Sequence, residues 1–178
     1  MKKNIENKSK ELAFLLRHDT EYQFDSHGWR KVEDLIKNHD YTMVELEEIV
    51  KTDNKQRYEF NDNKQLIRAR QGHSIPVDVE LKETIPPDIL YHGTAQRFLN
   101  SILEQGILKG TRLFVHLSDN IETAEKVGMR HGKPAVICIN TKQMAEDGIK
   151  FYLSANNVWL TEYVDSKYIT KINNNFKN

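Results

Sequence analysis

A proline-containing stretch without helical periodicity divides the sequence near its middle. Residues 74–89 read SIPVDVELKETIPPDI and hold three of the chain's four prolines. Proline lacks a backbone donor and fixes its own φ, so neither a long helix nor a central strand suits this stretch. We therefore expect two lobes, at 1–74 and 89–178, joined by a linker at 75–88 with at most one short extended segment.

The first lobe shows helical patterns followed by a hairpin pattern. Leu12, Leu15 and Leu16 share one face of a first helix, and a second helix follows. Thr42 and Glu45 form a capping-box pattern at the start of a third. The run RYEFNDNKQLIRARQG then predicts two strands joined by the turn NDNK. This order is that of a winged helix, and the lysine- and asparagine-rich chain ends are typical of frayed termini.

The second lobe alternates short strands with helices. Apolar runs predict strands at 89–92, 112–118, 134–140, 151–162 and 168–173, and helices at 95–105, 121–131 and 142–148. Asp119, three residues before Glu122, has the spacing of another capping box. The fold class is therefore predicted to be α+β.

Composition excludes several classes of protein. The 26 Lys and Arg residues balance the 26 Asp and Glu residues, so bulk charge does not favour non-specific nucleic-acid binding. The single cysteine, Cys138, excludes an internal disulfide framework and a cysteine-built zinc site. No HExxH, GxGxxG or GxxxxGK[ST] pattern occurs, so we expect no metal, Rossmann site or P-loop.

No apolar run approaches the roughly 18 residues that span a bilayer, and MKKNIENKSK lacks the apolar core of a signal peptide. We therefore expect a soluble, cytoplasmic protein.

Cationic side chains in the first lobe leave two interpretations open. Arg17 and His18 end the apolar run LAFLL, where they either complement a helix dipole or face an anion. Arg68 and Arg70 share one face of the second hairpin strand, which is either an ordinary polar face or part of a site. The following QGHS, with Gly72, adds polar atoms and backbone freedom at the lobe boundary.

The second lobe carries weaker signals. LYHGT predicts a strand end followed by a helix start, where backbone N–H groups receive phosphate or where Thr94 acts as an ordinary N-cap. His116 alternates with apolar neighbours and is therefore expected to face away from them. Arg130 and His131 stand at a helix end, where they could serve the dipole alone.

With these segments in place, the chain resembles the RNA 2′-phosphotransferase family of the KptA type, from about residue 9 to 169. The resemblance rests on SKELAFLLRH, GWRKVEDLI, IRARQGHS, LYHGT, ILKGTRLFVHLS, RHGKPAVI and FYLSANNVWLTE. It implies an N-terminal winged-helix RNA lobe and a C-terminal lobe like the ADP-ribosyltransferases that binds NAD. RNA with an internal 2′-phosphate, as in a tRNA, would be the substrate, and NAD would be consumed. We expect a monomer.

The resemblance also implies the site residues. Those expected to be catalytic are Arg17, His18, Arg68 and Arg130. Those expected near NAD are His92, Gly93, Thr94, Ser101, Arg112, His116, Ser118 and Val158.

Two positions depart from the family pattern. Asn157 stands where Gly is common, and we expect it to keep the left-handed turn. Arg70 replaces a smaller polar residue and points with Arg68. Two alternatives stay open: an ADP-ribosyltransferase that caps phosphorylated RNA or DNA ends, and a non-catalytic winged-helix RNA-binding protein.

Overall fold

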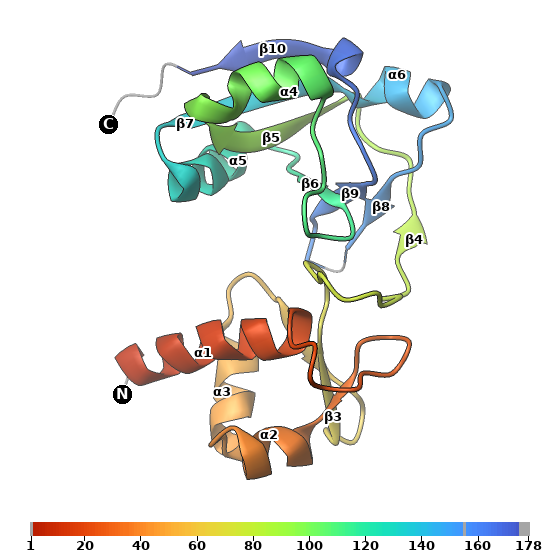
Figure 1. Ribbon diagram of the computed structural model, residues 1–178. Coiled ribbons are helices and arrows are strands. Elements are labelled where there is room, and N and C mark those ends of the chain that lie inside the picture. The colour runs from red at the N-terminus through yellow and green to blue at the C-terminus, as the bar shows by residue number, and fades with distance from the viewer. Residues whose placement is uncertain (1, 155, 175–178) are drawn as a thin grey trace. The chain divides into compact units, whose positions relative to one another are not determined.

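The computed structural model of the chain describes residues 2–154 and 156–174. The chain is a mixed α and β protein that forms two compact units, Met1–Glu80 and Leu81–Asn178 (Figure 1). Each unit has its own cluster of buried apolar side chains. No helix in the described part of the chain is both long and apolar enough to cross a bilayer.

The first unit combines three helices with a small antiparallel sheet. Its elements are α1 (Lys2–Arg17), β1 (Arg30–Lys31), α2 (Val32–Asn38), α3 (Met43–Thr52), β2 (Tyr58–Phe60) and β3 (Leu66–Ala69). The sheet order is β1-β3-β2, and β2 and β3 form the predicted hairpin, whose turn is closed by the Lys64 N–H donating to the Asn61 carbonyl. The two-residue strand β1 was not expected from the sequence.

Helix α1 begins much earlier than predicted. The expectation of a frayed N-terminus is wrong, because the helix starts at Lys2. Lys10 pairs with Glu6 one turn away at 3.4 Å, and Lys8 reaches Glu45 at the start of α3 at 2.8 Å. These pairs stabilise a polar segment that has little apolar periodicity.

The core of the first unit matches the predicted helical faces. Leu12 and Leu16 of α1 are fully buried, as are Leu46 of α3 and Ile67 of β3. The capping box is confirmed: the Thr42 side chain accepts from the Glu45 N–H, and the Glu45 carboxylate accepts from the Thr42 N–H. The buried faces fix where the C-terminal end of α1 lies in this unit.

The second unit contains two antiparallel sheets with helices around them. Its elements are β4 (Lys82–Glu83), β5 (Ile89–Ala95), η1 (Gln96–Phe98), α4 (Leu99–Gln105), β6 (Val115–Leu117), α5 (Ile121–Gly128), η2 (Met129–His131), β7 (Pro134–Asn140), α6 (Thr141–Glu146), β8 (Tyr152–Leu153), β9 (Trp159–Thr161), η3 (Ser166–Tyr168) and β10 (Ile169–Asn173). One sheet has the order β10-β7-β5 and the other β4-β8-β9-β6. The predicted alternation is confirmed, but α5 is capped by Asn120 rather than Asp119, because the Asn120 side chain accepts from the Thr123 N–H.

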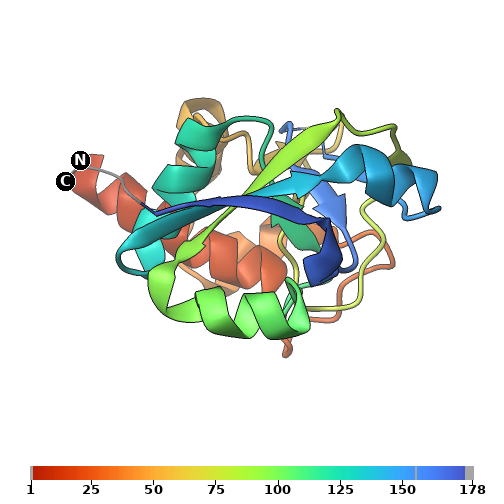
Figure 2. The ribbon, with the colours of Figure 1, turned by 90° about the horizontal axis from the view of Figure 1, so that it is seen from above.

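Helices α4 and α5 lie on opposite sides of the β10-β7-β5 sheet (Figure 2). Helix α5 approaches β5 very closely, and glycines make this possible. A Cβ at Gly93 would lie 1.7 Å from the carbonyl oxygen of Ala124, and one at Gly128 would lie 2.6 Å from that of Thr94. Packing alone therefore requires glycine at both positions.

We predict that Gly93→Ala destabilises the second unit by roughly 1–3 kcal/mol or more, since the added methyl group must displace the α5 backbone. Thermal unfolding followed by circular dichroism measures this. Gly110→Ala is the control: a Cβ there meets nothing within 4 Å, and only the positive φ of 62° opposes it. Equal losses of stability in the two variants would contradict the close-packing explanation.

Candidate functional site

The C-terminal end of α1 is held by the QGHS segment. The Ser74 N–H donates to the carbonyl oxygen of Arg17 at 3.0 Å, and the Ser74 hydroxyl lies 2.9 Å from Nδ1 of His18. The His18 N–H continues the helix by donating to the carbonyl of Phe14 at 2.8 Å. Two residues that the resemblance singles out are thus tied to a segment more than fifty positions further along the chain.

Gly72 and His73 bring the first unit's cationic residues together. Gly72 has a φ of 88°, and a Cβ there would lie 3.4–3.5 Å from the Arg17 guanidinium. The His73 ring is fully buried. Burial, and after it the charges of Arg17, His18 and Arg68, together lower the pKa of His73 to about 4. A neutral imidazole therefore lies among three cationic candidates, all within one unit.

Arg68 is surrounded by carboxylates and an aromatic ring. Its Nε donates to Glu59 at 2.6 Å, one Nη donates to Glu80 at 3.1 Å, and the guanidinium lies 4.4 Å from the Trp29 ring centroid. As predicted, Arg70 points the same way as Arg68. Its Nε lies 3.2 Å from Oε2 of Glu59, the carboxylate that Arg68 also contacts. The Glu80 side chain is 60% exposed and sits at a φ of 57°, so it is the more displaceable of the two carboxylates.

The second unit carries its own cluster of basic side chains. Nδ1 of His92 lies 3.2 Å from the carbonyl oxygen of His116. Burial is the main cause of a lowered pKa at His92, and the charges of His131 and Arg112 add to it. Although the Arg112 side chain is exposed overall, partial desolvation and then the charge of Arg130 lower its pKa. These residues, drawn from β5, η2 and the segment before β6, therefore share one electrostatic environment.

The LYHGT segment does not form a helix start. Strand β5 continues through Ala95 and leads into the 3₁₀ turn η1. Both earlier interpretations, phosphate at helix N–H groups after Gly93 and Thr94 as an N-cap, are wrong for this reason. The β5 backbone at these two residues is paired with β7, and both residues are buried.

The remaining candidates occupy three separate settings in the second unit. Ser101 is exposed on α4, and Ser118 pairs its backbone with that of Tyr91 in β5. Val158 is half-buried after a turn closed by Ser154, and its N–H donates to the Ser154 hydroxyl at 3.0 Å. Asn157 in that turn has a φ of 58°, which confirms the predicted left-handed conformation.

The sequence analysis assigned no role to two polar residues around the first unit's site. Arg30 is buried beside the end of α1, and Glu80 pairs with Arg68. Arg30 lies in the GWRKVEDLI motif and four residues before Asp34, but its contacts with α1, like the contact of Glu80 with Arg68, exist only in the folded chain. In the described part of the chain, no three His, Cys, Asp or Glu side chains group as a metal site would require.

Comparison with known proteins shows which family the chain belongs to. Residues 3–163 match the family model described as RNA 2′-phosphotransferase, Tpt1 / KptA family. The chain belongs to this family. It is 48% identical over 167 residues to a probable RNA 2′-phosphotransferase of Fusobacterium nucleatum, covering 89% of this chain and 93% of the relative. A protein of the same name from Hahella chejuensis is 44% identical over 178 residues, covering 96% of each chain.

In this KptA-family chain, His73 should make stability depend on pH. An imidazole with a pKa of about 4 when folded and about 6.5 when unfolded binds more protons in the unfolded state between these values. Stability therefore falls with falling pH, by roughly 2 kcal/mol between pH 7 and pH 5 from this group.

Urea unfolding of the wild type and of His73→Gln at both pH values measures the effect. The variant should lose most of this dependence, whereas His131→Gln, at an exposed ring, should keep it. A wild-type pH dependence that survives unchanged in His73→Gln would contradict the assignment.

Proposed function

We propose that the protein is an NAD-dependent RNA 2′-phosphotransferase. Its first unit is then a winged-helix RNA lobe and its second an ADP-ribosyltransferase-like NAD lobe. The observation that carries the proposal is the gathering of Arg17, His18 and Arg68 around His73 in a chain of this family. The relatives' names support the transfer of phosphate from RNA, and NAD is the part of the proposal that rests on the resemblance.

The proposed reaction has two steps. An oxygen of the RNA 2′-phosphate attacks C1″ of the nicotinamide ribose, the C1″–N bond breaks, and nicotinamide leaves with the bonding electrons. The ribose 2″-hydroxyl then loses its proton and attacks phosphorus, and the bond from phosphorus to the RNA 2′-oxygen breaks. That oxygen takes a proton, which releases RNA with a 2′-hydroxyl together with ADP-ribose 1″,2″-cyclic phosphate.

The first unit's residues suit the phosphate. A phosphomonoester is mostly dianionic near neutral pH, so the first step needs no general base. Negative charge accumulates on the phosphoryl oxygens in the second step, and Arg17 and Arg68 present permanently charged, planar donors for it. Arg130 of η2 is the further residue that the resemblance implies is catalytic. His18, whose ring is oriented by Ser74, is the residue that moves a proton.

The second unit's residues suit a dinucleotide. Arg112 offers positive charge for the pyrophosphate, and the half-buried His92 offers a ring nitrogen oriented through its other nitrogen's contact with the His116 carbonyl. Val158 places an apolar side chain at the position where many protein-directed ADP-ribosyltransferases have Glu. Because the nucleophile is already ionised, a carboxylate base is not needed there.

One experiment tests the proposal. The protein is incubated with an oligoribonucleotide bearing one internal 2′-phosphate, with and without NAD⁺, and the products are resolved by chromatography. NAD⁺-dependent formation of the 2′-hydroxyl RNA supports the proposal. A stable ADP-ribosylated product would instead indicate a capping ADP-ribosyltransferase, and unchanged RNA would indicate a binding protein.

Substitution of the α1 residues should slow the second step most. We expect Arg17→Ala and His18→Ala to reduce it by about 10²-fold or more, the size typical of a lost oxyanion donor or general acid–base group. Single-turnover kinetics, with the ADP-ribosylated intermediate followed over time, measure this. Lys37→Ala, at an exposed α2 residue, is the control. A second step as fast as in the wild type would overturn the assignment of these residues.

Glu80→Gln should strengthen substrate binding. Phosphate has to compete with the Glu80 carboxylate for Arg68, whereas Glu59 still holds the guanidinium through Nε. Removing an exposed ion pair worth up to about 1 kcal/mol lowers the KM for the phosphorylated RNA by about two- to fivefold. Glu47→Gln, which breaks an exposed ion pair with Lys64 in the same unit, should leave the KM unchanged. An unchanged or raised KM in Glu80→Gln would show that this carboxylate does not compete.

A further inference from the structure

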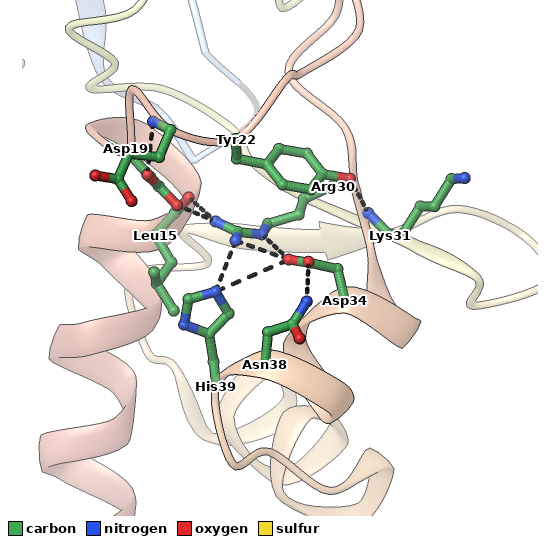
Figure 3. Close-up of polar contacts among 9 residues, drawn as sticks. Leu15, Asp19, Tyr22, Arg30, Lys31, Asp34, Asn38 and His39 are labelled. Atoms are coloured by element: carbon green, nitrogen blue, oxygen red, sulfur yellow. Dashed lines mark hydrogen bonds and ion pairs between the residues drawn. The ribbon is translucent and has the colours of Figure 1, made fainter.

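Among the described Lys and Arg side chains of the first unit, that of Arg30 is the most deeply buried. Its side chain is 2% exposed, and its guanidinium stacks 4.1 Å from the Tyr22 ring centroid (Figure 3). A charge removed from water is costly unless it is paired and hydrogen-bonded. Arg30 lies in β1 and is not one of the predicted site residues, so its partners define what it does.

Every N–H-bearing nitrogen of Arg30 has a partner. Nε donates to Oδ2 of Asp34 at 2.7 Å, and one Nη forms an ion pair with the same oxygen at 2.7 Å and donates to Nε2 of His39 at 2.8 Å. The other Nη donates to Oδ2 of Asp19 at 2.7 Å and to the carbonyl oxygen of Leu15 at 2.9 Å. Because a guanidinium only donates, Nε2 of His39 is the acceptor in this contact.

The two carboxylates belong to different parts of the unit. Asp34 lies within α2 and is also held by the amide of Asn38 at 2.8 Å. Asp19 directly follows His18, and Leu15 lies in the last turn of α1 (Figure 3). Nε of Arg30 therefore binds α2 through Asp34. One Nη binds the end of α1, which bears Arg17 and His18, through Leu15 and Asp19.

Hydrogen bonds from outside the helix hold the backbone at the C-terminal end of α1. The final carbonyls of an α-helix lack intrahelical partners. Here the Leu15 carbonyl accepts from Arg30 and the Arg17 carbonyl accepts from the Ser74 N–H, whereas the Phe14 carbonyl still accepts from the His18 N–H within the helical pattern. Loss of the Arg30 contact would release the helix end on the side opposite the Ser74 contact.

We propose that Arg30, acting through Asp19 and the Leu15 carbonyl, is a positioning residue that fixes the direction of Arg17 and His18 for phosphate transfer. This proposal rests on the proposed function for its kinetic consequence, but its structural consequence can be measured without any reaction.

Asp19→Asn and Asp34→Asn form a matched pair for the test. Each removes one negative charge from the same guanidinium at a largely buried position, with side chains 13% and 20% exposed. Only Asp19 adjoins His18. Arg30→Lys serves as a third variant, because it keeps the charge but cannot reach all four partners. All are compared at a temperature where circular dichroism shows them fully folded.

The first readout is amide hydrogen exchange by NMR. Asp19→Asn and Arg30→Lys should speed exchange of the His18 and Ser74 amides by at least about tenfold, and Asp34→Asn by less than about twofold. The second is single-turnover kinetics, in which the same two variants should slow the second step by at least about tenfold and accumulate the ADP-ribosylated intermediate.

Equal effects of the two aspartate variants on exchange and rate would overturn the proposal, since Arg30 would then only stabilise the unit. Wild-type exchange in Asp19→Asn would overturn it as well. If the wild type transfers no phosphate, the proposed function fails, and the exchange measurements alone decide whether Arg30 positions the helix end.

Discussion

The first unit's site depends on the last carbonyl oxygens of α1, which need hydrogen-bond donors from outside the helix. A helix that ends inside a folded unit must supply hydrogen bonds to its last carbonyl oxygens. This chain supplies them from two distant places, the guanidinium of Arg30 and the backbone of Ser74. Arg17 and His18 are consequently presented by a helix end that is held on two sides, and the dipole of that helix alone would not aim them.

The second unit meets a different constraint, the close approach of two backbones. Gly93 lies on a face of β5 that touches α5, so its lack of a side chain is explained by packing before any ligand is considered. The same short segment carries His92, whose ring nitrogen contacts the carbonyl of His116 across the neighbouring strands. Residues adjacent in the sequence thus have separate tasks, one in packing and one in the basic cluster.

The sequence predicted the elements whose signals are local. The Thr42 capping box, the β2–β3 hairpin and the left-handed Asn157 each follow from short-range chemistry and are confirmed. The polar start of α1 was missed because it is stabilised by ion pairs, such as that between Lys8 and Glu45, rather than by an apolar stripe. The role of Arg30 was missed because only Asp34 lies at helical spacing from it, whereas Leu15, Asp19 and His39 lie 15, 11 and 9 positions away.

Charge balance explains how a neutral chain could still recognise a phosphate. The 26 cationic side chains are matched by 26 carboxylates, and Arg68 shows the match at one position. Glu59 and Glu80 offset the charge of Arg68, which lies with Arg17 and His18 around His73. A dianion that replaces the exposed carboxylate of Glu80 would bring more charge and more acceptor oxygens to the same guanidinium. In the proposed function, the difference between one negative charge and two would therefore favour a phosphate dianion over the Glu80 carboxylate at Arg68.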